Sequence, residues 1–343
     1  MTRVRFWLGG LAVLVVALAW ARLEPSAGTE SVVVYSARKE ELLKPVVDGF
    51  ERASGIKVTL LSGKAGELAR RIETERANPR SDVFVGTTAG ISELLRERGL
   101  LEPPDGRSVE QIPAEFRAPD GSWIGVTGRA RVIIYNTALV PAGEAPRSFF
   151  DLTDPKWRGK VAVASIAERT TVGHLATIWK LRGESFTRAF VTRLRANGLK
   201  VLSNNTEVRK AVAGGEYPIG ITNHYYYLVQ LHESPQSPLG IVYPDQGPNE
   251  MGAPVQTITA SITRGAPHPE AAHRFMEYLI SPEGNRLLVV ESFELPILNG
   301  VAPVGLDRGI KPIGQFKRAH VTQLESAELE PTIEKAFGPL LVP

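Results

Sequence analysis

The sequence predicts an α/β protein built on parallel strands, with its 343 residues divided between two domains. Short β-branched runs alternate along the chain with segments of helical periodicity, which is the order expected when helices cover both faces of a parallel sheet. The length exceeds that of one ordinary core and suits two domains of roughly 150 residues. Apolar residues make up 43% and charged residues 22%, as in folded globular chains.

The first half of the predicted sheet follows from the segment after residue 30. Residues 31–35 (SVVVY) are typical of a buried strand, and apolar positions between 42 and 50 recur at helical spacing. Gly55 is a suitable C-terminal residue for this helix, and Pro45 places the helix start, or a bend, close by. Next come a strand at 56–60, a charged helix at 65–77 and a strand at 82–85.

The remaining elements continue the same alternation. We expect strands at 131–135, 160–164, 219–222 and 255–262, and an amphipathic helix at 269–282. Three tyrosines, 225 to 227, directly follow the strand at 219–222. No internal repeat or coiled coil is present.

The N-terminus has the pattern of an export signal. Arg3 and Arg5 precede an apolar run of about 16 residues that ends in an A-x-A site, so we expect cleavage after Ala21. This run is short for a membrane span, which makes an uncleaved anchor the alternative. Residues 22–30 read as a disordered lead-in. The protein is therefore expected to be periplasmic.

Composition and missing motifs exclude several functions. The net charge of +3 includes Arg3 and Arg5, so nothing in the mature chain predicts nucleic-acid binding. With no cysteine, disulfides, thiolate metal sites and a lipoprotein anchor are excluded. No phosphate-binding glycine loop, nucleophile elbow or paired-histidine zinc motif occurs. We therefore expect no enzyme, and keep an exported enzyme or sensor domain as a distant alternative.

The tyrosine cluster is the feature that points to chemistry. Ligands of open α/β sheets bind beyond the carboxyl ends of strands, and a following helix N-terminus favours anionic groups there. Phenolate is a hard oxygen donor, and a bound cation can hold it deprotonated. Tyr225 and Tyr226 therefore suit a hard ion such as Fe(III). The alternative is a rim of half-buried aromatic side chains.

Seven stretches, in this order, resemble the periplasmic ferric-ion-binding proteins of ABC transporters. They are VYSARKE (34–40), SGIKVT (54–59), SGKAGEL (62–68), SDVF (81–84), GRARVIIYN (128–136), DPKWRGKV (154–161) and NHYY (223–226). The resemblance runs from about residue 31 to the end. It implies a type II-like periplasmic-binding-protein fold with two lobes, two crossing hinge strands and a ligand cleft between the lobes.

The resemblance also implies how the chain divides. We expect the first lobe to contain residues 31–127 and about 257–306. The second lobe would then contain residues 128–256 and about 307–343. The hinge strands would lie near 127–131 and 256–261. Ligand binding would then bring the two lobes together by bending at these strands.

The family's site residues map unevenly onto this chain. Tyr225 and Tyr226 match its metal-binding tyrosine pair, and Arg129 matches its anion-binding arginine, whose guanidinium suits carbonate or phosphate. Asn205 and Asn223 match positions that touch the anion in some members. A hinge salt bridge is the alternative role for Arg129, and a helix N-cap is the alternative for Asn205.

First-lobe coordination departs from the family. A histidine or tyrosine is common in the loop after the first strand, where this chain has Arg38, Lys39 and Glu40. Thr87 replaces a glutamate found in some members, and no tyrosine occurs in 165–170. Glu40 and Tyr227 are further candidate ligands, although consecutive helical residues diverge by about 100°. For His224 we expect a role other than ligation.

Two ligands compete within this fold. The first prediction is Fe(III) with a synergistic anion, carbonate or phosphate, delivered to an ABC permease and its ATPase by a monomeric protein. The alternative is an oxyanion or phosphorylated organic solute bound without metal by Arg129 and the two asparagines.

Overall fold

The structure is a computed structural model that describes residues 30–104 and 109–343. The predicted signal peptide, and the lead-in before residue 30, lie outside the described residues. Within the described ranges, no helix is both long and apolar enough to cross a membrane.

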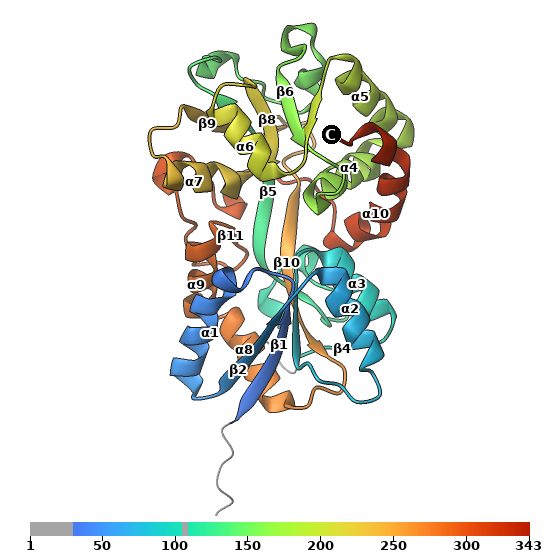
Figure 1. The fold of residues 1–343 in the computed structure, drawn as a ribbon, viewed down its shortest axis with the longest axis vertical. Coiled ribbons are helices and arrows are strands. Elements are labelled where there is room, and N and C mark those ends of the chain that lie inside the picture. The colour runs from blue at the N-terminus through green and yellow to red at the C-terminus, as the bar shows by residue number, and fades with distance from the viewer. Residues whose placement is uncertain (1–29, 105–108) are drawn as a thin grey trace, which may run out of the picture.

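Among the described residues, eleven strands form one sheet, with helices packed around it (Figure 1). Eight of them follow one path, and the other three pair beside it. The strands are β1 (Ser31–Ser36), β2 (Lys57–Ser62), β3 (Val83–Gly86), β4 (Leu101–Glu102), β5 (Ile124–Asn136), β6 (Val161–Ala164), β7 (Lys200–Leu202), β8 (Ile219–Asn223), β9 (Leu239–Val242), β10 (Val255–Thr263) and β11 (Leu295–Pro296). The helices are α1 (Glu40–Ser54), α2 (Ala65–Thr74), α3 (Ala89–Glu97), α4 (Arg169–Arg182), α5 (Glu184–Ala196), α6 (Asn205–Ala213), α7 (His224–Glu233), α8 (Pro269–Leu279), α9 (Pro282–Ser292) and α10 (Gln323–Phe337).

Strand β5 belongs to both halves of the sheet. Its first part pairs antiparallel with β10, whose other edge joins β3, β1 and β2. Its second part pairs with β8, and β8 continues through β6 to β7. In Figure 1, β5 and β10 run side by side between the two lobes. The polypeptide therefore crosses from lobe to lobe on long strands, as predicted.

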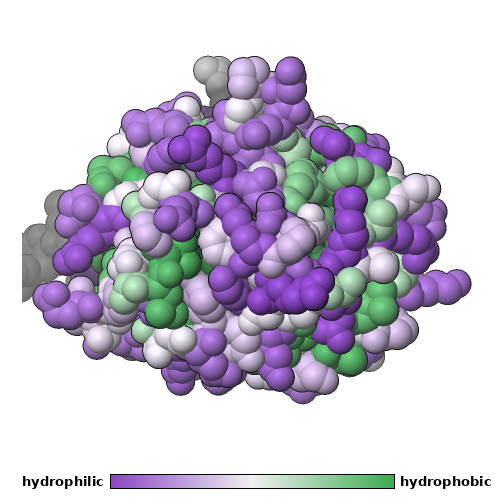
Figure 2. Space-filling view, turned by 90° about the horizontal axis from the view of Figure 1, so that it is seen from above, coloured by the Kyte–Doolittle hydropathy of each residue, from purple (hydrophilic) through white to green (hydrophobic). Residues whose placement is uncertain are grey.

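Each lobe has its own apolar core. In the first lobe, α1, α8 and α9 pack over the strands. Here the rings of Phe50 and Phe275 are in edge-to-face contact, with their centroids 5.0 Å apart. In the second lobe, α4 and α5 cover the sheet and bury Phe149 and Phe190. Helix α10 packs against α4 and also against α3 of the first lobe, so it contacts both halves. Seen from the second-lobe end, polar residues cover most of the surface and apolar patches are small (Figure 2).

The predicted elements are present, but the strand predicted at 131–135 is only the second part of the thirteen-residue β5, and two helix ends differ. The helix predicted at 65–77 ends at Thr74. The helix predicted at 269–282 ends at Leu279, and α9 begins separately at Pro282. Proline lacks the N–H that would continue the first helix, and the Ser281 hydroxyl accepts a hydrogen bond from the Gly284 N–H to start the second. Gly55 has the left-handed conformation predicted for a helix end, at φ 74°.

Candidate ferric-ion site

Tyr225 and Tyr226 lie in the first turn of α7, at the carboxyl end of β8. Their ring centroids are 4.2 Å apart with an interplanar angle of 31°. Both side chains are half-buried. Asn223, the residue before the helix, makes no side-chain capping hydrogen bond, so the helix N–H groups and the positive end of its dipole remain available near the two phenols.

The surroundings of the two phenols oppose ionisation unless a cation is bound. Burial, together with the charge of Tyr226, raises the pKa of Tyr225 well above 10. Burial also raises the pKa of Tyr226, against the lowering effect of Arg129 and Arg131. Neutral phenols are therefore the resting state, and a hard cation would have to displace their protons.

Arg131, two residues after Arg129 on β5, forms hydrogen bonds with Asn205 and Asn223, the two asparagines predicted to contact the anion. Its Nη1 donates to Asn205 Oδ1 at 3.0 Å and to Asn223 Oδ1 at 3.2 Å. The side chain is fully buried, and burial lowers its pKa to about 10. The helix-cap interpretation of Asn205 is wrong, because Asn204 accepts the hydrogen bond from Glu207 N–H. Asn205 instead donates to Glu168 Oε2 at 3.0 Å.

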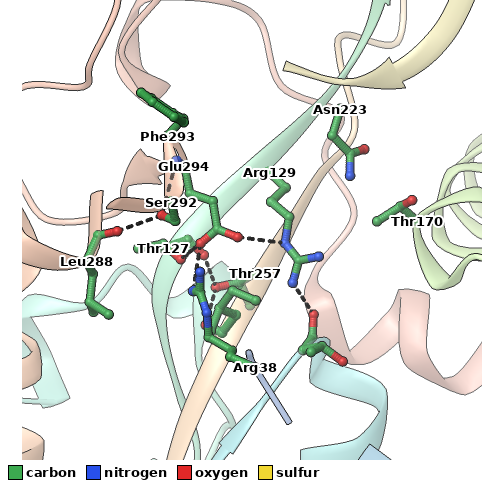
Figure 3. Close-up of polar contacts among 12 residues, drawn as sticks. Arg38, Thr127, Arg129, Thr170, Asn223, Thr257, Leu288, Ser292, Phe293 and Glu294 are labelled. Atoms are coloured by element: carbon green, nitrogen blue, oxygen red, sulfur yellow. Dashed lines mark hydrogen bonds and ion pairs between the residues drawn. The ribbon is translucent and has the colours of Figure 1, made fainter. Parts of the chain in front are cut away.

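Arg129 lies between Glu294 and the side where Asn223 and Thr170 lie (Figure 3). Its Nε is 3.3 Å from Glu294 Oε1, and its Nη2 donates to the Thr87 carbonyl oxygen. The hinge salt bridge considered as its alternative role is thus present. In Figure 3 the remaining nitrogen, Nη1, points away from Glu294 toward the side where Thr170 and Asn223 lie. The described residues give Nη1 no hydrogen bond, so this donor is open to an anion.

Glu294 is a buried carboxylate between two arginines. Arg38 Nη1 lies 2.9 Å from its Oε2, and the Thr127 hydroxyl donates to the same oxygen at 2.5 Å. Burial alone would raise the pKa of Glu294, but Arg38, Arg129 and the hydroxyl outweigh it and the pKa is lowered. The Arg38 side chain, in the loop after β1, is thereby bound to Glu294.

The other candidate residues face different surroundings. The Tyr227 hydroxyl donates to the Arg308 carbonyl oxygen at 3.1 Å. Glu40 is exposed in the first turn of α1. His224 Nδ1 accepts from the Ala130 N–H at 3.2 Å and its Nε2 lies 3.0 Å from the Phe293 carbonyl oxygen, so the buried ring links β5 to the segment after α9.

Sequence reasoning missed Arg131, Arg38, Glu294 and Glu168. Arg131 had a usable signal, because residues two apart on a strand share a face and Arg129 was already a candidate. Glu294 had no such signal in the sequence, because it lies 165 positions from Arg129 and belongs to no recognisable motif. The described residues contain no cluster of three or more His, Asp or Glu side chains placed to hold a metal.

Two lobes joined through long strands, with polar side chains converging between them, define an extracellular solute-binding protein. The family model described as "Bacterial extracellular solute-binding protein" matches residues 32–293, and the chain belongs to this family.

Its relatives include iron-binding proteins, which confirms the resemblance noted in the sequence. The chain is 31% identical to "Iron uptake protein A1" of Synechocystis over 92% of this chain and 85% of that protein. It is 28% identical to "Fe(3+)-binding periplasmic protein" of Serratia marcescens over 86% of this chain and 87% of that protein.

Solved structures agree with the fold. A Trichodesmium protein in complex with iron and citrate has a TM-score of 0.81 at 30% identity, covering 90% of this chain and 99% of that one. Iron-bound HitA from Pseudomonas aeruginosa has a TM-score of 0.80 at 26% identity, with the same coverage. The two-lobed periplasmic-binding-protein fold is therefore the fold of this chain.

Proposed function

We propose that this protein is an exported carrier that captures ferric iron in the periplasm and delivers it to an ABC permease and its ATPase. The observation that carries the proposal is the pair Tyr225 and Tyr226 at the N-terminus of α7, beside Arg129 and Arg131. Two phenolates are hard anionic donors, and the arginines supply positive charge for an accompanying anion. The names of the iron-binding relatives support the same cargo.

In this proposal Tyr225 and Tyr226 bind Fe(III) as phenolates, and carbonate or phosphate completes the coordination against Arg129. Asn205 and Asn223 act through Arg131, because each accepts a hydrogen bond from that side chain. Tyr227 and Glu40 are left out of the ligand set. The Tyr227 hydroxyl is engaged by Arg308, and Glu40 faces solvent.

Tyr→Phe substitution tests the metal site, because it removes the oxygen donor and keeps the ring. Iron-loaded wild-type protein should absorb visible light through phenolate-to-iron charge transfer. Tyr225→Phe or Tyr226→Phe should abolish or shift this band, with thermal unfolding of the iron-free protein nearly unchanged. Tyr278→Phe in α8 is the matched control and should keep the band. Unaltered spectrum and affinity in both site variants would refute the tyrosine assignment and favour a metal-free oxyanion or phosphorylated solute.

The anion is tested separately by comparing iron retention with and without bicarbonate or phosphate. Arg129→Ala should weaken retention chiefly by losing the anion, so added anion should restore it only in part. Full restoration at low anion concentration would contradict a direct role for Arg129.

The lobes are proposed to be discontinuous in sequence, 31–127 with about 257–306 and 128–256 with about 307–343. Ligand binding should bring the two lobes together by rotation about the hinge strands. Small-angle X-ray scattering measures this: saturating iron and anion should reduce the radius of gyration of a monomeric particle. An unchanged radius would contradict closure.

Export is proposed to end with cleavage after Ala21. Intact-mass measurement of the protein secreted by its own host should give a chain that starts at Arg22. A mass that still includes residues 1–21 would instead favour an uncleaved anchor.

A further inference from the structure

The His224 ring lies between two strands that pair with the same edge of hinge strand β5. Strand β8 pairs with this edge from Arg131 onwards, and β11 pairs with it at Thr127 and Gly128, where β10 occupies the opposite edge. The Ala130 N–H falls between β8 and β11 and donates to His224 Nδ1 at 3.2 Å. The ring therefore takes the place of a strand carbonyl where β5 passes from one half of the sheet to the other.

The other ring nitrogen reaches the segment between α9 and β11. His224 Nε2 lies 3.0 Å from the Phe293 carbonyl oxygen. Because Nδ1 accepts from a backbone N–H and Nε2 faces a carbonyl, the proton is on Nε2 and the ring is the neutral tautomer. Phe293 has a left-handed backbone, at φ 57°, which a side chain of this size adopts only where its surroundings hold it. The fully buried ring thus joins α7 to a segment that the proposed division places in the first lobe.

Each attachment of this imidazole is one residue away from a group of the candidate site. Tyr225 follows it in the chain, and the centroids of the two rings are 6.2 Å apart in an edge-to-face arrangement. Ala130 directly follows Arg129 on β5. Phe293 precedes Glu294, the carboxylate that pairs with Arg129 (Figure 3). One buried ring therefore links the start of the tyrosine helix to the arginine and to the segment that carries its counter-charge.

We infer that His224 is a positioning residue for iron binding, which holds the start of α7, and with it both phenols, in a fixed place relative to Arg129 while the lobes rotate. The inference rests on the proposed function. His224 does not bind the metal, because both of its nitrogens are engaged by backbone groups. Hydrogen bonds behind a set of ligands orient them, and losing such a bond commonly weakens metal binding by about 10- to 100-fold.

His224→Leu tests this, because it removes both hydrogen bonds and keeps an apolar side chain of similar volume. Iron affinity, measured by competition with citrate, should fall about tenfold or more, and the phenolate-to-iron band should shift because the phenols are no longer held in place. In the iron-free protein, deuterium exchange at the Ala130 amide should become faster, since this N–H has lost its acceptor. His232→Leu is the matched control, at an exposed histidine of the same helix, and should equal wild type in all three measurements.

His224→Asn separates the two contacts, and it also serves if His224→Leu is too unstable to load with iron. The asparagine Oδ1 takes the place of Nδ1 and can accept from Ala130, whereas the shorter side chain does not reach the Phe293 carbonyl. We expect exchange at Ala130 close to that of wild type, but weaker iron binding and a shifted band.

Two results would overturn the inference. The first is a loss of stability in the His224 variants with wild-type spectrum and affinity, because the ring would then serve the fold alone. The second is unchanged exchange at Ala130 in His224→Leu, because the ring would then not hold β5. Wild-type protein with no visible band in any buffer would instead overturn the proposed function itself.

Discussion

Arg129 and Glu294 form a buried ion pair, with Nε 3.3 Å from Oε1, that joins hinge strand β5 to the segment between α9 and β11. The same carboxylate holds Arg38 from the loop after β1. Three segments that are far apart in the sequence are therefore linked by the carboxylate of Glu294. The ion pair holds the Arg129 side chain through its Nε, and Nη1, which makes no hydrogen bond within the described residues, faces the second lobe (Figure 3).

Glu294→Gln should strongly destabilise the protein, because it leaves two buried arginines without their counter-charge. Breaking such a buried pair costs about 3–5 kcal/mol. Urea unfolding of the iron-free protein measures this loss. Glu73→Gln removes the partner of Arg98, where both side chains are more than 40% exposed, and should cost less than about 1 kcal/mol. Equal effects of the two substitutions would contradict this account.

Tyr227→Phe should leave the iron spectrum unchanged, although Tyr227 directly follows the two proposed ligands. Its hydroxyl donates to the Arg308 carbonyl oxygen, and the next residue along a helix points about 100° away. Losing this hydrogen bond should cost about 1 kcal/mol of stability. Visible titration with iron and urea unfolding test both statements, and a shifted band would return Tyr227 to the ligand set.

The tyrosine pair could be proposed as a site from the sequence because its signal is local. Three adjacent tyrosines follow a β-branched run, and the end of a strand that leads into a helix is where ligands gather in such sheets. Strand β1 and the C-terminal end of α1 were found for the same reason, because the β-branched run and Gly55 lie within these features or next to them. The start of α1 was not found: Pro45 was expected to lie near it, but Pro45 lies inside the helix, which begins at Glu40. The end of α8 was misplaced because apolar spacing continues past a proline that starts another helix.

The charge partners could not be found in this way. Arg38, Arg129 and Glu294 are brought together by the crossing of β5 between the lobes, which no local pattern encodes. The assignment of the asparagines is similar. Their positions were predicted, but which of two arginines on the same strand face they contact depends on how β8 and α6 pack against β5. Glu168 resembled any charged residue before a helix.

Gly252→Ala should be severely destabilising. Gly252 has φ 83°, and an added Cβ would lie 2.6 Å from the Arg318 carbonyl carbon. At this place the backbone before β10 pairs with residues 317–319. We expect a cost above about 3 kcal/mol, from left-handed strain of about 1–2 kcal/mol and the backbone clash together.

Gly300→Ala provides the control for the strain alone. Its φ is 87° and an added Cβ meets nothing within 4 Å, so only about 1–2 kcal/mol should be lost. Urea unfolding of the two variants separates the contributions. Similar losses would show that the segment around Arg318 moves aside freely.

Glu330 should make stability depend on pH near neutrality. This buried carboxyl of α10 lies 3.6 Å from Arg169, close to Glu334 on its own helix and against Gly90 of α3. Burial raises its pKa to about 7, from 4.5. The folded state therefore binds the proton more tightly than the unfolded state. The stabilisation is complete below about pH 4.5 and is lost as the pH rises through 7, by roughly 3 kcal/mol at most.

Glu330→Gln removes this dependence, because the amide stays neutral at every pH. We expect the variant to be about 1–3 kcal/mol more stable than wild type at pH 8 and nearly equal to it at pH 4, measured by urea unfolding of the iron-free protein. Glu328→Gln, an exposed carboxylate of the same helix, should change neither value. A difference between Glu330→Gln and wild type that is the same at both pH values would show that Glu330 keeps its charge when buried, with Arg169 and the α3 N-terminus compensating its desolvation.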